Sequence, residues 1–170
     1  MNIRKATTED IPVLEKVIID SFLIPHGHAA PKELIDNYIS RNFNKKAIEL
    51  DITSPNNQYH VIEYQNQIVG FSKIMFNYPD ENIQDKNVTK MERIYLLKEY
   101  YGLGLGKKLF QFNADLAKEN QQNGMWLHVW IENKRAIQFY QKMGMNSVGS
   151  YDFPVSKDYT NENHVMYIEF

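Results

Sequence analysis

The chain has 170 residues, of which 43% are hydrophobic and 13% aromatic, so it fits one domain and can bury a hydrophobic core. Its formal net charge of −2 argues against a protein that binds nucleic-acid backbones. Because it contains no cysteine, a disulfide scaffold, a cysteine nucleophile and thiolate metal sites are all excluded.

No feature of the sequence divides the chain or directs it to a membrane. No internal repeat, low-complexity tract or Gly/Ser/Pro linker is present, so we expect one domain over residues 1–170. The first twelve residues are polar and lack the apolar stretch of a signal peptide, and no apolar run has the length that spans a bilayer. These observations predict a cytoplasmic protein without a membrane partner.

The first part of the chain predicts an edge strand followed by helices. Apolar residues at Ile11, Leu14 and Ile18 keep helical spacing, and Thr8 is the expected N-cap of that helix. Residues 25–31 begin and end with proline and predict a loop. The expected elements are a strand over residues 1–6, a helix beginning near residue 8, a second helix opened by Pro31, and a short helix over residues 45–50.

The rest of the chain predicts strands first and then strands alternating with helices. Two strands rich in β-branched and aromatic residues form a hairpin signal around the polar residues 65–67. Gly144 is well placed to end the last helix in a left-handed conformation. The expected elements are strands over residues 59–64, 68–76, 88–97, 125–131, 145–153 and 164–170, and helices over residues 105–121 and 133–143. This order indicates a mixed α/β fold rather than a regular βαβ repeat.

A glycine-rich turn joins the strand over residues 88–97 to the following helix. Gly102, Gly104 and Gly106 allow consecutive backbone N–H groups to face one concavity, and the start of the helix adds its own unpaired N–H groups. Lys107 and Lys108 add positive charge nearby. The hypothesis is a phosphate-bearing cofactor, and the alternative is a tight turn packed against a neighbouring strand.

Two familiar phosphate-binding motifs do not fit this turn. A Walker A loop requires glycine where Tyr101 stands and serine or threonine where Lys108 stands. A dinucleotide fingerprint requires glycine at Lys107 or, in the other frame, at Leu109. The turn alone therefore predicts only a phosphate group.

Two segments resemble the GNAT superfamily of N-acetyltransferases. Residues 101–106 (YGLGLG) are similar to its acetyl-CoA signature, Arg/Gln-x-x-Gly-x-Gly/Ala, with Tyr101 in place of the usual Arg or Gln. Residues 133–144 are similar to its second motif, Asn-x-x-Ala-x-x-Phe-Tyr-x-x-x-Gly. Within the superfamily, residues 92–95 (ERIY) and 140–144 (YQKMG) resemble bacterial spermine/spermidine N-acetyltransferases.

The resemblance implies an α/β (mixed α+β) GNAT fold, with a central, mostly antiparallel, twisted sheet of about seven strands flanked by about four helices. It implies acetyl-CoA as co-substrate, no metal, and direct attack by a primary amine, such as the polyamines spermidine and spermine. Alternative acceptors are peptide or protein N-termini, amino acids and other small amines. A non-catalytic acyl-CoA-binding sensor is the alternative from another class. Homodimers are common in this family, although no feature of the sequence demonstrates one.

The resemblance also assigns residues to the cofactor. The backbone of Ile94, Tyr95 and Leu96 is implied to pair with the pantetheine arm, and the glycine turn is implied to hold the pyrophosphate. Asn133 is assigned to the cofactor, although a role as helix N-cap explains it equally well. Tyr140 is the implied acid for the departing CoA thiolate, and the alternative is a core aromatic residue. The full set is Ile94, Tyr95, Leu96, Gly102, Leu103, Gly104, Leu105, Gly106, Lys107, Asn133 and Tyr140.

A second set of residues is assigned to the acceptor amine. Glu92 is the candidate base or amine anchor, and the alternative is a carboxylate that faces solvent or pairs with a cation. His26 and His28 are expected in the loop between the first two helices, where this family builds acceptor pockets, and Tyr38 joins them as a substrate-binding residue. A His-x-His pair also suggests a metal, but no third ligand is evident. The other histidines, expected to be structural, are His60, His128 and His164. The aromatic residues that can line a pocket for an aliphatic amine are Tyr38, Phe43, Tyr78, Tyr151 and Phe153.

Overall fold

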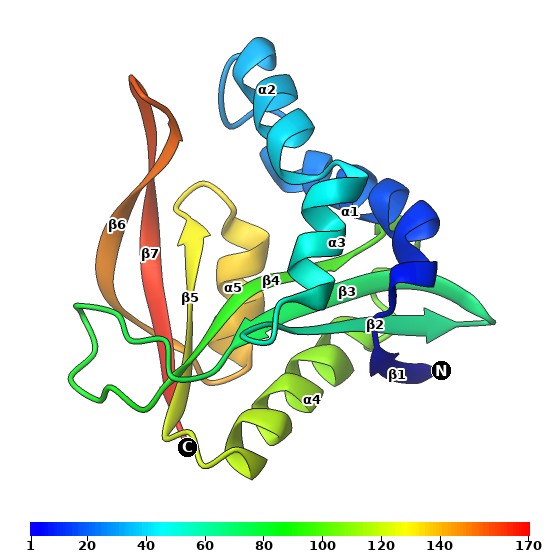
Figure 1. The fold of residues 1–170 in the computed structure, drawn as a ribbon. Helices are drawn as coiled ribbons and strands as arrows, with labels where there is room; N and C mark the ends of the chain where they lie inside the picture. The colour runs from blue at the N-terminus through cyan, green and yellow to red at the C-terminus, as the bar shows by residue number, and fades with distance from the viewer. The chain divides into compact units, whose positions relative to one another are not determined.

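The computed structural model describes residues 1–170 and contains five α-helices and seven strands (Figure 1). The strands belong to one sheet, in the order β1-β2-β3-β4-β5-β7-β6. The elements are β1 (Asn2–Lys5), α1 (Ile11–His26), α2 (Lys32–Asn42), α3 (Lys45–Thr53), β2 (Gln58–Tyr64), β3 (Gln67–Met75), β4 (Thr89–Leu96), α4 (Leu105–Glu119), β5 (Gly124–Trp130), α5 (Lys134–Lys142), β6 (Asn146–Ser156) and β7 (Tyr159–Glu169), with short 3-10 helices η1 (Thr8–Asp10) and η2 (Lys98–Tyr100).

The mixed α/β fold with a sheet of seven strands is confirmed. The structure has five α-helices where about four were expected, because α3 continues to Thr53 and is a full helix. The chain divides into two compact units: residues 1–73 with 93–110, and residues 74–92 with 111–170. None of the helices is both long and apolar enough to span a bilayer.

The first unit is built around the apolar faces of α1, α2 and α3. Leu14, Ile18 and Ile48 from two of these helices are buried with Val61 and Phe71 of β2 and β3. β1 pairs antiparallel with β2, from Asn2 opposite Glu63 to Lys5 opposite His60. The hairpin between β2 and β3 turns at Gln65 and Asn66, whose φ angles of 50° and 62° match the left-handed turn that strand twist favours.

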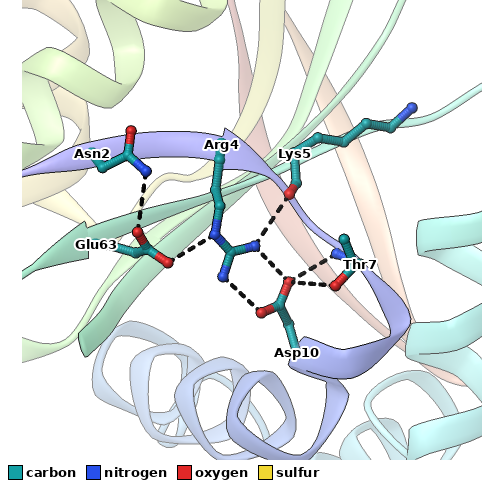
Figure 2. Close-up of polar contacts among 6 residues, drawn as sticks. All are labelled: Asn2, Arg4, Lys5, Thr7, Asp10 and Glu63. Carbon is teal, nitrogen blue, oxygen red and sulfur yellow. Dashed lines mark hydrogen bonds and ion pairs between the residues drawn. The ribbon is translucent and has the colours of Figure 1, made fainter. Parts of the chain in front are cut away.

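Arg4 connects β1, β2 and the first helical turn (Figure 2). Its guanidinium donates to both carboxylate oxygens of Asp10 at 2.8 Å and to Glu63 at 2.8 Å. Asp10 also accepts a hydrogen bond from the backbone N–H of Thr7, again at 2.8 Å. The expected N-cap at Thr8 was therefore wrong by one residue: Thr7 precedes η1, and Asp10 bonds back to its N–H in the manner of a capping box.

We expect Arg4→Met to lower the free energy of unfolding by about 1–2 kcal/mol, because it removes charge-assisted hydrogen bonds to the nearly buried carboxylate of Asp10. The effect is limited because the Arg4 guanidinium is partly exposed to solvent. The hydrogen bond from Arg4, followed by that from Thr7, lowers the pKa of Asp10 below its ordinary value of 3.8. A lowered pKa stabilises the fold above that ordinary value and loses its effect as the pH falls through the lowered value. In urea titrations the difference between wild type and variant should thus be constant from pH 5 to 7 and shrink below about pH 4. Lys16→Met, which breaks the exposed Lys16–Asp20 pair, should leave the free energy of unfolding nearly unchanged.

Helix α1 extends further than the sequence indicates. Residues 25–31 were expected to form a loop, but Pro25 and His26 form the last turn of α1. The N–H of Gly27 donates to the carbonyl of Leu23 at 2.8 Å, which closes that turn. The His26 ring also stacks on Phe22, four residues earlier, at a centroid distance of 4.8 Å. Packing thus holds a proline within the helix despite the backbone hydrogen bond it removes.

The second unit is dominated by antiparallel pairing of β5, β7 and β6. β7 pairs with β5 from Gly124 opposite Glu169 to Trp130 opposite Asn163, and β6 and β7 form a long hairpin (Figure 1). β4 pairs in parallel with β5 at Thr89–Met125 and Lys90–Trp126. Gly144, with φ of 92°, follows α5 in the left-handed conformation predicted for it.

Candidate active site

The glycine turn of the first unit has the backbone geometry of an anion cradle. Gly102 and Gly104 have φ angles of 81° and 76°, which side-chain-bearing residues rarely adopt. A Cβ atom built on either glycine meets no other atom within 4 Å, so the space beside the backbone is open. Since the chain itself does not fill this space, it is available to a ligand that approaches the backbone closely.

The start of α4 supplies hydrogen-bond donors to the same turn. The first closing bond of the helix runs from the N–H of Lys108 to the carbonyl of Gly104 at 3.1 Å. The N–H groups of Leu105, Gly106 and Lys107 therefore have no carbonyl four residues earlier within the helix. Together with the helix dipole, these donors fit the negatively charged oxygens of a pyrophosphate.

The strand that leads into the turn places its side chains alternately on two faces. Ile94 and Leu96 pack with Leu105 and Leu109 of α4. Tyr95 lies on the other face and packs against the cluster formed by α1, α2 and α3. The three residues assigned to the pantetheine arm are thus anchored from both sides, which fixes the strand backbone between them.

Tyr95 joins two of the predicted acceptor residues in an aromatic cluster. Its hydroxyl lies 3.2 Å from Nε2 of His26. Phe22 stacks on His26 at 4.8 Å and on Tyr38 at 5.5 Å between ring centroids. The structure therefore brings His26, Tyr38 and Tyr95 together, whereas His28 is exposed.

His26 is uncharged in this setting. Burial, followed by the nearby His28, lowers its pKa to about 4. The placement expected for His26, in a loop, was wrong because it belongs to the last turn of α1. His28 does lie in the connection between α1 and α2. Phe22 contacts both His26 and Tyr38 but was not predicted as a site residue, because its position in the helix has the spacing of an ordinary core residue.

Tyr140 lies on α5 of the second unit and is buried. The residue is 9% exposed, and burial raises the pKa of its phenol above the ordinary value of 10.0. The phenol consequently retains its proton at neutral pH, as a general acid requires. The role of Tyr140 as general acid remains a prediction, because its packing also fits a core aromatic residue.

Asn133 and Glu92 are the polar side chains predicted to contact the cofactor and the amine. The Asn133 side chain accepts a hydrogen bond from the N–H of Ala136 at 3.2 Å, so it is the N-cap of α5. That structural role is observed, and a cofactor contact stays a prediction. Glu92 is exposed on β4 between the buried Met91 and the half-buried Arg93. A carboxylate in solvent is accessible to an amine, but the exposure equally fits the structural alternative.

The remaining sequence candidates lie in different places. Phe43 is 2% exposed and belongs to the core of the first unit. Tyr78 and Tyr151 line a cavity of about 370 Å³ in the second unit, together with His128. Phe153 lies on β6, edge-on to Tyr151. His60 is buried on β2, which lowers its pKa to about 4, and His164 lies on β7.

One ion cluster of the first unit was not predicted. Asp51 on α3 accepts from Lys73 of β3 and from Arg93 of β4, both at 2.7 Å. The residues are far apart in the sequence, so no local pattern indicates that they meet. This cluster connects α3 to β4 at the residue that follows Glu92.

The glycine turn and the unpaired N–H groups at the start of α4 form a candidate site for a phosphate-bearing cosubstrate. The chain belongs to the acetyltransferase (GNAT) family, whose pattern matches residues 18–145, and it is an N-acetyltransferase of that family. The fold, the family and the enzyme class that the two sequence motifs predicted are therefore confirmed.

Relatives support the family without fixing the acceptor. An uncharacterised N-acetyltransferase of Lactobacillus delbrueckii is 24% identical over 93% of this chain and 91% of that protein. A probable spermine N(1)-acetyltransferase of Bacillus subtilis is 34% identical over 53% of this chain and 60% of that protein. The crystal structure of the PaiA N-acetyltransferase of Thermoplasma acidophilum, in complex with coenzyme A, has the same fold, with a TM-score of 0.77 at 19% identity over 99% of this chain and 98% of that one.

Proposed function

We propose that this protein transfers the acetyl group of acetyl-CoA to a primary amine, and that the acceptor is a polyamine such as spermidine or spermine. The observation that carries the cofactor half is the turn at Gly102 and Gly104, with positive φ angles and open space beside the backbone. The acceptor half is supported by likeness to the probable spermine N(1)-acetyltransferase.

Acetyl-CoA supplies a thioester, and the residues of this chain bind it and move protons. The N–H groups from Leu105 to Lys107 hold the pyrophosphate, and the backbone of β4 aligns the pantetheine arm. As the amine nitrogen bonds to the thioester carbon, Glu92 accepts a proton from that nitrogen. When the carbon–sulfur bond breaks, the sulfur takes the phenolic proton of Tyr140.

The test is thiol release from acetyl-CoA with a panel of spermine, spermidine, putrescine, lysine and a peptide with a free N-terminus. We expect the highest kcat/KM with spermine or spermidine. A preference for lysine or the peptide would contradict the polyamine assignment and leave the acetyltransferase. Binding of CoA without turnover on any amine would favour a sensor, and absence of CoA binding would contradict the whole proposal.

We expect Gly104→Val to weaken CoA binding at least about tenfold in calorimetry, because the new side chain occupies the open space beside the turn and Val cannot hold a φ of 76° without strain. Gly144→Val is the matched control, since it imposes similar strain at φ of 92° at the end of α5. That control should lower thermal stability comparably and leave CoA affinity nearly unchanged. Equal CoA affinity in the wild type and in Gly104→Val would remove the turn as the cofactor site.

A further inference from the structure

The second unit contains a cavity lined by Tyr78 and Tyr151, two of the aromatic residues considered for an amine pocket, and by none of the residues assigned to catalysis or to acetyl-CoA. Its volume is about 370 Å³, in the range of small-molecule sites. Its walls are the loop that follows β3, the start of β4, and the strands β5 and β6. The lining side chains include the aromatic rings of Tyr78, Trp126 and Tyr151.

A cation and two carboxylates line this cavity. The Lys90 ammonium lies 4.9 Å from the ring centroid of Tyr78 and 5.2 Å from that of Trp126. Aromatic faces attract an ammonium ion, so they hold the Lys90 head group in the cavity wall. Asp80 and Glu81 carry the negative charge, and both belong to the loop after β3.

His128 also lines this cavity. Its Nε2 atom is 3.5 Å from Oδ2 of Asp80, beyond ordinary hydrogen-bond length. Burial, followed by the positive charge of Lys90, lowers the pKa of His128, and Asp80 opposes that effect. The His128 ring stacks on Tyr151 with centroids 4.1 Å apart, which fixes that wall of the cavity.

The local framework of the cavity is also fixed. The Trp126 Nε1–H donates to the carbonyl of Tyr78 at 2.7 Å and ties the loop to β5. Asp80 accepts from the backbone N–H and the side-chain amide of Asn82, both at 2.9 Å. The carboxylate of Asp80 therefore keeps its direction when a ligand enters.

A ligand with a single sign of charge does not complement this arrangement. Asp80 and Glu81 would attract a polyamine, but Lys90 would repel it. Lys90 would attract a simple carboxylate, but Asp80 and Glu81 would repel it. A ligand that carries both signs a few ångströms apart satisfies both poles, and the aromatic walls cover its apolar part. We propose that this cavity binds a zwitterionic small molecule, with an α-amino acid as the simplest case.

The proposal goes beyond acetyl transfer and is tested without acetyl-CoA. The probes are leucine, 3-methylbutylamine, which lacks only the carboxylate, and 4-methylpentanoate, which lacks only the ammonium. Each is titrated into the full chain while the indole N–H resonance of Trp126 is followed by NMR. We expect leucine to bind at least about tenfold more tightly than either single-charge analogue, because each analogue lacks one of the two charges that Lys90 and the carboxylates of the cavity attract.

The variant Lys90→Met should reduce leucine affinity at least about tenfold, to the level of 3-methylbutylamine. Lys118→Met is the matched control, because Lys118 lies 4.9 Å from the ring of Phe170 and forms the same kind of contact elsewhere in the unit. Asp80→Asn serves as a second variant and should lower leucine affinity while binding of 4-methylpentanoate is preserved or improved. Circular dichroism confirms that each variant is folded.

Three outcomes would overturn the proposal. Tightest binding of 3-methylbutylamine would make the cavity a cation site, and tightest binding of 4-methylpentanoate would make it an anion site. No perturbation of Trp126 by leucine would show that the cavity does not take a zwitterion. Because none of these measurements involves acetyl-CoA, failure here is distinguishable from failure of the proposed acetyl transfer.

Discussion

Replacement of Tyr140 by phenylalanine should lower kcat about a hundredfold and leave CoA affinity nearly unchanged, if its phenol protonates the departing thiolate. The substitution removes one oxygen from a residue that is 9% exposed and keeps its buried aromatic ring on α5. The loss should therefore concern the proton donor rather than the fold. Stopped-flow or steady-state thiol release with saturating acetyl-CoA measures the effect, and calorimetry measures CoA affinity.

The pH dependence gives an independent check on Tyr140. Burial raises the pKa of its phenol above 10.0, so the donor form persists throughout the neutral and mildly alkaline range. The wild type should consequently show no loss of turnover from ionisation of Tyr140 below about pH 10.

Tyr167→Phe is the control for Tyr140→Phe, since Tyr167 is another tyrosine of the second unit whose pKa is raised but which has no assigned role. Unchanged turnover in Tyr140→Phe would remove Tyr140 as the acid.

The sequence predicted those parts of the site whose residues are set by local backbone geometry. Gly102 and Gly104 adopt positive φ angles because the strand must turn sharply into α4, and only glycine does so without strain. Asn133 and Gly144 mark the two ends of α5 for comparable local reasons. Motifs of this kind are readable because the residues that define them are neighbours in the chain.

The features that the sequence did not predict depend on contacts between distant residues. Pro25 suggested a loop, but α1 continues because His26 stacks on Phe22 and reaches Tyr95 on β4. Likewise, the cavity lined by Lys90 and Trp126 becomes visible only when β4 and β5 pair. Neither the packing of residues distant in the sequence nor the pairing of β4 with β5 follows from a local pattern of residue types.

Asp51→Ala should lower the free energy of unfolding by about 3–5 kcal/mol, because the substitution leaves two largely buried cations without their shared carboxylate. The side chains of Lys73 and Arg93 are 8% and 13% exposed, and that of Asp51 is 20% exposed. A loss of this size is a large part of the total stability of a small domain. Chemical denaturation measures this loss of stability, and an unchanged m-value shows that unfolding is still two-state.

A compensating variant shows whether buried charge is the cause. Asp51→Leu combined with Lys73→Met removes one of the two cations together with the carboxylate, and should recover at least about half of the lost stability. Arg93 remains in that double variant, with its guanidinium 5.1 Å from the ring centroid of Phe43. If the double variant is as unstable as Asp51→Ala, the contribution of Asp51 lies in packing rather than charge. If stability recovers and kcat does not, the carboxylate has a separate effect on β4, because Arg93 directly follows Glu92 and precedes the residues assigned to the pantetheine arm.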